Sequence, residues 1–485
     1  MPSYRDARAA EAAVAAALVA AAVRLPGAIR DSFWQDEVAS ARIIVEPTVG
    51  AMLGRVRATE ATPPLWYALG WVLHELGLTP YGYRLFGLLF GGLLAVATWF
   101  LARRIVAPPG AAAATAIVVL GYQFVDHGRE LRAYELYALL AVVFALALLR
   151  ALERPEWRRL VALALVAAGG CLTNYFFVLF LACGLAWAWA ARAPRRVAAA
   201  ALAGFALFLP WLPAALSQYD HHRFSWIGHF RLSSVLSAYW LLVAHNEPAT
   251  AVLHRLAPYA ALALVLVAAA VLARRDGEAR LVALLAVGPV AIAAVVWAAG
   301  PEVFDPRNVI GAGPFAAIAV ASLLVRLPVR AAAPLAAAGL GLLAYGYVSS
   351  ERTPPTDFEG IAHALVREGW SPRTPIVLYD GNFFAFRGPL EWYLPGRPDL
   401  TLGRPTDRAC GGAFAVVAGD RHAQLLAGRL RWADASETTH VTTARLPAPV
   451  HLPARRLRAM HVITAARGNA ACVRPLPESR LTAVS

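Results

Sequence analysis

The chain has 485 residues, of which 59% are hydrophobic and 16% are charged, and its formal net charge is +14. Soluble domains usually carry about 25% charged and about 45–50% apolar residues. This composition, with a mean hydropathy of +0.53, therefore excludes an ordinary soluble protein and indicates an integral membrane protein. The positive charge is carried by Arg, since Lys is absent, and Arg gathers at the ends of apolar runs. Membrane orientation explains that pattern better than nucleic-acid binding.

Apolar runs that approach the length needed to cross a bilayer recur over residues 1–349. We predict an α-helical polytopic membrane protein with about eleven transmembrane helices, since one span needs about 20 residues. The first run could pass for a signal peptide, but the many later runs favour an uncleaved first span. The predicted spans are 9–29, 83–105, 110–126, 134–151, 159–173, 175–191, 196–216, 257–273, 281–299, 308–326 and 331–348.

Arginine-rich junctions fall on every second connection between these runs. Positively charged loops tend to stay in the cytoplasm, so we expect the N-terminus inside and the C-terminus outside. The high Arg and Ala content is typical of a GC-rich bacterial genome, which suggests a bacterial cytoplasmic (inner) membrane. The junctions are 102–104, 150–159, 191–196, 273–280 and 326–330.

The first outer loop, 30–82, contains an apolar segment, "PPLWYALGWVLHELG" (63–77), that is short for a span. Counting it as a span would move the arginines of the next junction outside. We therefore predict an interfacial or re-entrant helix, with His74 and Glu75 on its wet face. The stretch 38–58 has mixed amphipathic character and is predicted to form a helix on the membrane surface.

A second long outer segment, 217–256, holds several histidines and aromatic residues. The histidine spacing matches no standard zinc pattern, and the aromatic residues suit a membrane-interface belt. We predict a loop that packs over the site, without a metal. The histidines are His221, His222, His229 and His245, and the aromatic residues are Tyr219, Phe224, Trp226, Tyr239 and Trp240.

The chain changes character near residue 350, where charges, prolines and short β-like runs begin. We divide it into a transmembrane module, 1–349, and a small extracytoplasmic α/β domain, 350–485, which has an ordinary domain size. Its predicted elements are a helix over 358–370 and strands over 374–380, 413–419 and 460–466.

Four cysteines occur in the chain. Cys171 and Cys183 fall in apolar spans and are expected to be packing residues. Cys410 and Cys472 both fall in the C-terminal domain, where an extracytoplasmic compartment permits a disulfide. The sequence leaves open whether these two are bonded.

Charged residues gather at the outer ends of the predicted spans and in the outer loops. Ionisable groups near membrane depth indicate a functional site. A carboxylate can accept a proton from an attacking hydroxyl, and arginines can bind a phosphate through two parallel hydrogen bonds. This combination predicts a site for a lipid-phosphate donor. The candidate residues are the adjacent carboxylates Asp36 and Glu37, then Glu130, Arg132 and Tyr134, and finally Arg307.

The motifs that hold these residues, in this order, resemble the GT-C superfamily of membrane glycosyltransferases, in the branch of bacterial relatives of protein O-mannosyltransferases and aminoarabinose transferases. "PPLWYALGWVLHELG" is similar to the family's H-P-P-L-Y-Y segment, and "RELRAYELYALL" (129–140) to its Q-E-A-R-x-Y-x-L. Thr62 departs from the His that often precedes Pro-Pro, and Asn308 follows Arg307 where Tyr is common. The other motifs are "WQDE" (34–37), "YRLFGLLFGGLLAVATWFLARRI" (83–105), "FLPWLP" (208–213) and "FDPRNVI" (304–310).

The resemblance implies a hexosyl or pentosyl transferase that moves a sugar, with inversion, from a polyprenyl-phosphate-linked donor to an acceptor hydroxyl. It implies Asp36 as the base and Glu37 as a residue that orients the acceptor or supports the base. No cofactor is expected to be required, and a divalent metal is compatible with the family but not favoured. The expected partners are the donor lipid, membrane lipids and an acceptor protein, lipid or glycan, without nucleic acid. The donor-binding residues would be Glu130, Arg132, Tyr134 and Arg307.

The same residues also have structural interpretations. Asp36 and Glu37 could cap a surface helix that begins near Val38, because acids favour helix N-termini. The arginines have alternatives of their own: Arg132 could pair with Glu130 or Glu135, Arg307 could pair with Asp305, and Arg129 is expected to anchor the interface.

Two other classes of protein stay open. A transporter or flippase of a lipid-linked or anionic solute would also need intramembrane charges, but no internal repeat is apparent and the charges lie toward one face. A non-catalytic assembly protein would explain the C-terminal domain but not the adjacent Asp36 and Glu37. No P-loop or dinucleotide-binding motif occurs. The sugar, the acceptor and the oligomeric state are not determined by the sequence.

Overall fold

The chain forms two compact units in a computed structural model. The first consists of Met1–Ile29 and Ile43–Ser350, and the second of Arg30–Arg42 and Glu351–Ser485. The short segment 30–42 therefore groups with the C-terminal residues. The structure describes residues 4–221, 227–243, 251–275, 277–352, 358–367, 372, 376–379, 383–394, 396, 400–410, 414–419, 440–443, 460–465 and 470–475.

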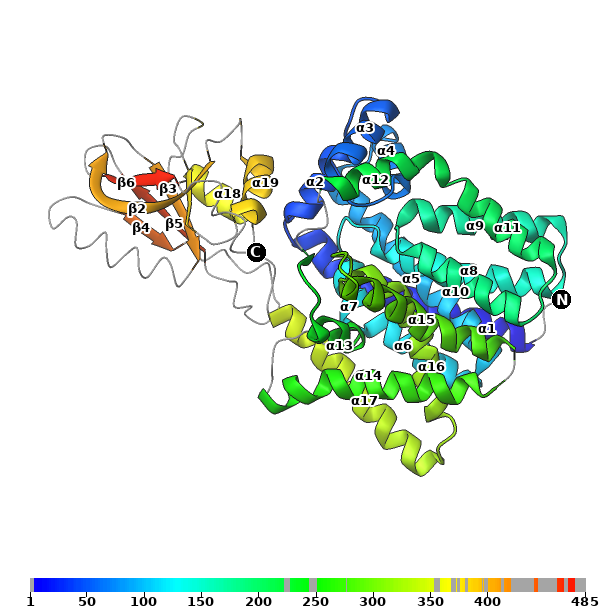
Figure 1. Ribbon diagram of the computed structural model, residues 1–485. Coiled ribbons are helices and arrows are strands. Elements are labelled where there is room, and N and C mark those ends of the chain that lie inside the picture. Colours follow the sequence, from blue (N-terminus) through cyan, green and yellow to red (C-terminus); the bar gives the residue numbers. More distant parts are fainter. Residues whose placement is uncertain are drawn as a thin grey trace. The chain divides into compact units, whose positions relative to one another are not determined.

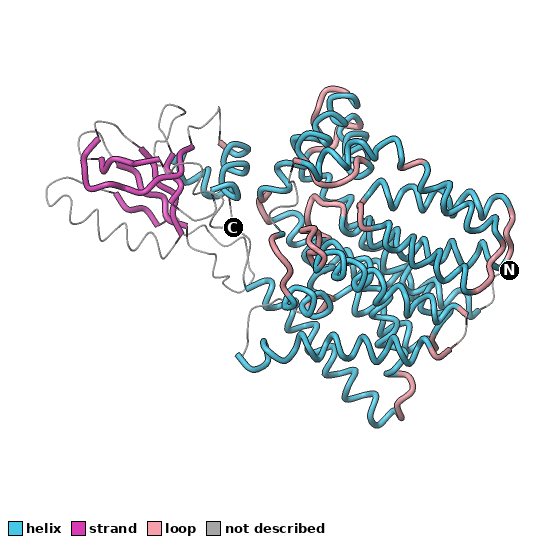
Figure 2. The backbone as a smooth tube through the Cα atoms, in the orientation of Figure 1, coloured by secondary structure: helices cyan, strands magenta, loops and turns pink. Residues whose placement is uncertain are grey.

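The first unit is an assembly of helices that run roughly side by side (Figures 1 and 2). Among the described residues, eight helical segments are long and apolar enough to cross a membrane, and α6 and α10 are shorter apolar helices. The predicted fold class is confirmed. The helices are α1 (Tyr4–Arg30), α5 (Pro80–Ile105), α6 (Pro108–Leu120), α8 (Tyr134–Glu153), α9 (Trp157–Thr173), α10 (Phe177–Ala190), α11 (Arg195–Ala206), η1 (Leu209–Trp211), α12 (Leu212–Asp220), α14 (Ala251–Ala273), α15 (Glu278–Ala298), η3 (Pro306–Ala312), α16 (Gly313–Leu324) and α17 (Val329–Arg352).

Local sequence explains where many of these helices begin and end. In α5, the hydroxyl of Thr79 accepts a hydrogen bond from the backbone of Gly82, Pro80 opens the first turn, and Arg103 and Arg104 lie in the last turn. Proline suits a first helical position because its missing N–H would be unpaired there anyway. Basic residues at a C-terminus complement the helix dipole.

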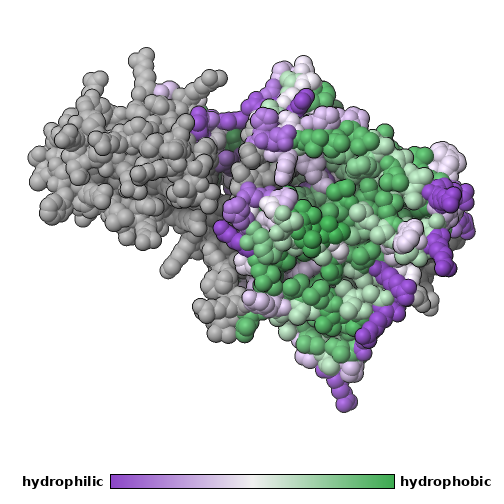
Figure 3. All heavy atoms as spheres, in the orientation of Figure 1, coloured by the Kyte–Doolittle hydropathy of each residue, from purple (hydrophilic) through white to green (hydrophobic). Residues whose placement is uncertain are grey.

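The surface of the first unit is that expected of a membrane protein. Figure 3 shows a broad apolar band over its helices, with hydrophilic side chains gathered at the margins. Large apolar side chains on several helices are exposed, among them Leu165, Trp189 and Val295. Apolar patches of this extent are rare on soluble monomers, and here they indicate contact with lipid.

The predicted span over 110–126 is interrupted at Gly121, which separates α6 from the short helix α7 (Tyr122–His127). Close packing explains the interruption. A Cβ atom on Gly121 would lie 2.3 Å from the carbonyl oxygen of Leu242. Gln123 contacts the same segment, since its backbone N–H donates to the carbonyl of Leu241 at 3.1 Å. The segment after α13 (Leu232–Trp240) thus holds the start of α7.

Short helices occupy the long predicted loop between α1 and α5. The segment 63–77 forms α4 (Leu65–Glu75), whose 11 residues reach only about 16 Å and cannot span a bilayer. His74 was expected on a wet face, but it is half-buried and its Nδ1 lies 2.8 Å from the hydroxyl of Tyr83. Glu75 is exposed as predicted. The stretch 38–58 lies in α2 (Gln35–Ile44) and α3 (Val49–Thr59).

The second unit contains a mixed six-stranded sheet among its described residues, with strand order β4-β5-β3-β1-β2-β6. β1 pairs in parallel with β2 and β3, and the remaining pairs are antiparallel. The predicted strands near 374–380, 413–419 and 460–466 correspond to β1, β3 and β5. The elements are α18 (Phe358–Arg367), β1 (Ile376–Tyr379), α19 (Phe383–Tyr393), β2 (Leu400–Cys410), β3 (Phe414–Gly419), β4 (His440–Thr443), β5 (Met460–Ala465) and β6 (Ala470–Pro475).

The cysteines fall where the sequence places them. Cys171 and Cys183 are buried free thiols within apolar helices, so their prediction as packing residues is confirmed. Cys410 and Cys472 lie on the paired strands β2 and β6, where Cys410 is opposite Ala470 and Cys472 is opposite Thr406. Their side chains lie outside the described part of the chain, so the disulfide stays a prediction.

Candidate functional site

Ionisable side chains of the first unit concentrate on α7 and on the loop that leads from it into α8. α7 lies at the end of the unit away from the N-terminus (Figure 1). The helix ends at Gly128, where a Cβ atom would lie 2.4 Å from Nε of Arg24 and 2.7 Å from Oε1 of Glu135. Only glycine lets the chain turn this closely against those two side chains, so the turn fixes the direction of residues 129–133.

The last turn of α7 carries Asp126, whose carboxylate is firmly paired. Arg129 donates from Nη2 to Oδ1 of Asp126 at 2.6 Å, and the hydroxyl of Tyr122 donates to Oδ2 at 3.3 Å. Burial alone would raise the pKa of Asp126, but the guanidinium of Arg129 holds it below its ordinary value. Asp126 is therefore an anion, and Arg129 is 8% exposed. The expectation that Arg129 anchors the interface is wrong, because it is buried and held by this pair.

His127 forms a second pair beside the first. Its Nδ1 lies 3.0 Å from Oε2 of Glu130, and its ring packs on Tyr134 with 4.6 Å between ring centroids. Burial alone would lower the pKa of His127, but Glu130 and Asp126 together raise it above its ordinary value, against the opposing charge of Arg307. His127 therefore connects the predicted residues: Glu130 and Arg307 act on its charge, and Tyr134 packs on its ring.

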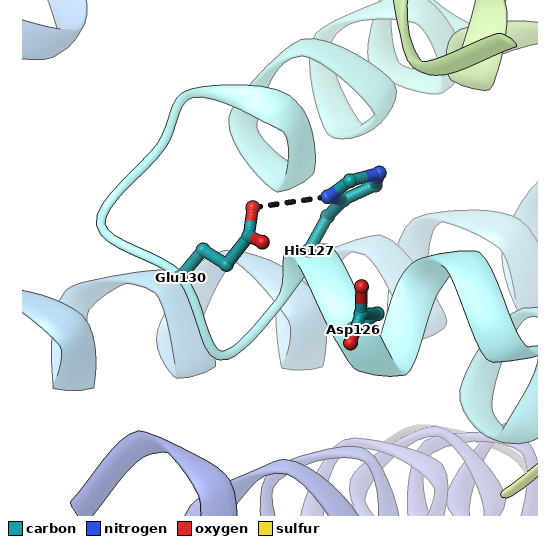
Figure 4. A group of neighbouring side chains, drawn as sticks. All are labelled: Asp126, His127 and Glu130. Atoms are coloured by element: carbon teal, nitrogen blue, oxygen red, sulfur yellow. Dashed lines mark hydrogen bonds and ion pairs between the residues drawn. The ribbon is translucent and has the colours of Figure 1, made fainter. Parts of the chain in front are cut away.

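Three of these side chains have the chemistry of metal ligands. One ligand atom from each of Asp126, His127 and Glu130 lies within 4.8 Å of the others. Figure 4 shows Asp126 and His127 at the end of α7 and Glu130 in the following loop, with the His127–Glu130 contact dashed. Two carboxylates and an imidazole suit a divalent transition metal. The 2.6 Å contact of Arg129 with Asp126 places a competing cation on the same carboxylate.

Arg132 belongs to a buried polar cluster of its own. Its Nη1 lies 3.4 Å from Oε2 of Glu60, and the same oxygen accepts a hydrogen bond from the hydroxyl of Tyr67 at 2.8 Å. Thr62, which stands where relatives often have His, lies 3.0 Å from that hydroxyl. The alternative pairing of Arg132 with Glu130 or Glu135 stays a prediction, while Glu60, at the end of α3, is a carboxylate partner that the sequence did not suggest.

Arg307 lies at the start of η3, and its structural alternative is confirmed. Its Nε is 3.3 Å from Oδ1 of Asp305, and Asp305 also accepts a hydrogen bond from the backbone N–H of Arg307 at 3.0 Å. The carbonyl of Asn308 accepts a hydrogen bond from the hydroxyl of Tyr137 at 3.0 Å. Because Tyr137 is one turn into α8, this bond holds Arg307 beside the helix that begins at Tyr134.

Asp36 and Glu37 lie in the first turn of α2, in the part of that helix that belongs to the second unit. Glu37 is buried, and its Oε2 accepts a hydrogen bond from the backbone N–H of Trp34 at 3.3 Å. This is one half of a capping box, in which an acid at the third helical position binds back to the cap. The helix begins at Gln35, not near Val38. Glu37 therefore has a capping role, while Asp36 is half-buried.

The segment 217–256 is more structured than the predicted loop, since it contains the helix α13, which packs on α14 and η3. His221 is exposed, and His229 is 96% exposed with its Nδ1 3.2 Å from Oε1 of Glu302. His222, Phe224, Trp226 and His245 lie outside the described residues. Among the residues that the structure describes, the one group that could hold a metal is Asp126, His127 and Glu130.

Sequence reasoning missed a buried ion pair behind the site. Arg24 of α1 and Glu135 of α8 are 0% and 1% exposed, with 3.2 Å between Nη2 and Oε1. Arg24 also donates to the backbone carbonyls of Ala20, Val118, Val119 and Phe124. The available signal was a lone arginine inside the first apolar run, because such a charge needs a buried partner.

Comparisons with known proteins agree with this architecture. Residues 61–213 match the family model described as dolichyl-phosphate-mannose-protein mannosyltransferase. The matched region begins just before Thr62 and includes α7, Glu130, Arg132 and Tyr134. A comparison with curated protein sequences finds no match.

Two solved structures share the fold across most of the chain. ArnT from Cupriavidus metallidurans, bound to undecaprenyl phosphate, is 14% identical; the match covers 95% of this chain and 99% of ArnT, with a TM-score of 0.52. The archaeal oligosaccharyltransferase AglB from Archaeoglobus fulgidus, in complex with an inhibitory peptide and a dolichol-phosphate, is also 14% identical. That match covers 80% of this chain but only 64% of AglB, with a TM-score of 0.53.

The shared fold and the family-model match agree with each other. The chain is a polytopic membrane protein with the fold of the GT-C superfamily, so the resemblance drawn from the sequence is confirmed. Within that superfamily, it is similar over nearly its whole length to ArnT from Cupriavidus metallidurans.

Proposed function

We propose that the protein is a membrane glycosyltransferase that transfers a hexose or pentose, with inversion, from a polyprenyl-phosphate-linked donor to an acceptor hydroxyl. The observation that carries this proposal is the GT-C fold shared over 95% of the chain with ArnT, which was solved bound to undecaprenyl phosphate. AglB was solved with a dolichol-phosphate, so both neighbours bind a lipid phosphate. We place the reaction on the outer face of a bacterial cytoplasmic membrane, as the arginine-rich junctions favour.

The donor phosphate is proposed to bind near the N-terminus of α8. Helix N-termini attract anions through their unpaired N–H groups and dipole, and Arg132 and Tyr134 lie at this one. Arg307 is held beside α8 by the bond from Tyr137 to Asn308. A guanidinium has five N–H donors, so it can contact its carboxylate partner and a phosphate oxygen together. Glu130 is proposed to fix the position of the His127 ring.

The proposed reaction needs two kinds of residue: a base for the acceptor hydroxyl and cations for the leaving group. Asp36 takes the proton of the acceptor hydroxyl as its oxygen forms a bond to the anomeric carbon of the sugar. The bond from that carbon to the phosphate oxygen breaks, and its electron pair stays on the departing polyprenyl phosphate. Arg132 and Arg307 stabilise the charge that develops there. Glu37 supports the base by fixing the first turn of α2.

We expect Arg132→Ala to lower turnover by about 100- to 1,000-fold, because one preorganised donor to a developing anion is worth about that much. Arg132→Lys should recover only part of this, since lysine keeps the charge but lacks the planar fork. The exposed Arg57 offers a matched control in Arg57→Ala, which should act like the unmodified protein. The measurement is release of polyprenyl phosphate from a radiolabelled lipid-linked sugar by purified protein in lipid nanodiscs.

The same assay separates the proposed enzyme from a transporter or flippase. An enzyme releases polyprenyl phosphate and labels the acceptor, whereas a transporter moves the intact donor across a vesicle membrane without cleaving it. Protein hydroxyls, lipids and glycans should each be offered as acceptors. If the donor crosses the vesicle membrane intact and is not cleaved in the presence of any acceptor tried, the glycosyltransferase proposal is contradicted.

We propose that the reaction needs no bound metal, because Asp126, one member of the candidate metal group, is paired with Arg129 at 2.6 Å. Incubation with a millimolar chelator, followed by its removal, is expected to leave turnover unchanged. Loss of activity that manganese, magnesium or zinc restores would contradict this. Asp126→Asn and Glu130→Gln would then be the variants that identify the ligands.

A further inference from the structure

The segment that carries Asp36 and Glu37 belongs to the same compact unit as the C-terminal residues. Residues 30–42 form one compact unit with 351–485, although more than 300 residues of chain separate them. The proposed base therefore lies on a piece of backbone whose neighbours come from α18 and α19, not only from its own loop.

Two hydrogen bonds fix the backbone just before α2. The N–H of Phe358, at the start of α18, donates to the hydroxyl oxygen of Ser32 at 2.8 Å. The N–H of Phe33 donates to the hydroxyl oxygen of Tyr393, at the end of α19, at 2.6 Å. Ser32 and Phe33 are buried, so breaking either bond would leave a buried polar group without its partner.

Side-chain packing on α19 reinforces these bonds. The ring of Phe33, which is 0% exposed, packs on Trp392 with 6.3 Å between centroids. At the far end of the segment, Nη2 of Arg42 lies 3.2 Å from Oε2 of Glu391 and 3.5 Å from the carbonyl of Gly388. Contacts at Phe33 and at Arg42 thus hold the segment on both sides of Asp36.

We propose that α19 positions the catalytic carboxylate, with Tyr393, Trp392 and Glu391 acting as positioning residues for Asp36. The inference rests on the proposed function, in which Asp36 is the base. Asp36 is three residues from Phe33 and in the first turn of the helix, so a shift of Phe33 moves its carboxylate directly. Displacing a reacting group by about 1 Å can slow a reaction about 100-fold.

Tyr393→Phe tests the proposal because it removes one hydroxyl and little else. We expect the kcat for sugar transfer to fall by about 10-fold to about 100-fold, while the Kd for polyprenyl phosphate stays unchanged. The same substitution at exposed Tyr259 of α14, Tyr259→Phe, is the control. Hydrogen exchange of residues 30–42, read by mass spectrometry on the full-length protein, should rise in Tyr393→Phe alone.

Exchanging the charges of Arg42 and Glu391 gives a second test, which does not depend on the hydroxyl of Tyr393. Arg42→Glu and Glu391→Arg should each lower kcat and loosen residues 30–42. The double variant should recover part of both, because Glu391 also pairs with Arg387 at 2.7 Å. If the Arg42–Glu391 pair had only a structural role, the double variant would regain stability but not kcat.

The two proposals can fail separately. If residues 30–42 exchange faster in Tyr393→Phe while the unmodified protein cleaves no lipid-linked sugar, the glycosyltransferase proposal fails and the positioning contact stands. If the unmodified protein turns over and Tyr393→Phe matches it in kcat and in exchange, the positioning proposal is overturned. If kcat and stability fall together with no change in exchange at 30–42, Tyr393 is a folding residue only.

Discussion

Asp36→Asn is expected to remove nearly all sugar transfer while the protein stays folded in the membrane. Asparagine keeps the size of the side chain but cannot take the proton of the acceptor hydroxyl. A positioned general base contributes about 100-fold to 10,000-fold to the rate, so loss of activity in that range is expected. Release of labelled polyprenyl phosphate and labelling of the acceptor are the measurements, made at equal amounts of folded protein.

Glu37 provides the informative comparison, because it lies next to Asp36 and makes a capping bond to Trp34. The amide oxygen of Glu37→Gln can still accept that bond, so this variant should lose far less activity than Asp36→Asn. Glu75→Gln, at an exposed position at the end of α4, serves as the surface control. Equal turnover by Asp36→Asn and the unmodified protein would reduce Asp36 to a helix-cap residue and end the proposed mechanism.

The helical architecture follows from sequence patterns that depend on local composition. Apolar runs and arginine-rich ends predict α1, α5, α8, α14 and α15, because a bilayer demands long apolar helices whatever their partners are. The helix break at Gly121 was not predicted from sequence patterns. Its cause is the backbone carbonyl of Leu242, which lies 2.3 Å from where a Cβ atom of residue 121 would be. A close approach by chain more than 100 residues away leaves no local pattern.

The C-terminal residues 351–485 show the same limit of local patterns. β1, β3 and β5 are short apolar runs and were predicted, whereas β2 contains charges and a proline, "LTLGRPTDRAC", and was missed. α19 was also missed, because "FFAFRGPLEWY" holds a glycine and a proline within the helix. Helix and strand propensities are weak preferences that tertiary contacts override.

For the candidate site, sequence identified the charged residues but not their partners. Arg307 pairs with a near neighbour, Asp305, as one alternative held. Arg132 pairs with Glu60, 72 residues away, a partner that the order of residues along the chain did not suggest. Asp126 ends the predicted span 110–126 and His127 follows it, but neither was singled out, because their role depends on α7 turning beside the loop that carries Glu130.

Removing Arg24 is expected to damage folding more than any other single change to the first unit considered above. Arg24→Met leaves the carboxylate of Glu135 buried, at 1% exposure, without its cation. Breaking a buried ion pair by removing one partner destabilises a protein by about 3–5 kcal/mol. The variant should therefore accumulate poorly in the membrane and, once purified, lose its monodisperse peak at a lower temperature than the unmodified protein.

The double variant Arg24→Met, Glu135→Met should recover much of that loss, because two apolar side chains of similar size replace both charges. Arg326→Met, an exposed arginine after α16, should change stability by less than about 0.5 kcal/mol, as is usual for surface positions. Recovery of folding without recovery of turnover would show that the pair also sets the path of residues 128–134, which Arg24 and Glu135 contact at Gly128. If Arg24→Met is as heat-stable as Arg326→Met, the prediction is contradicted, because burial of Glu135 would then not depend on its ion pair with Arg24.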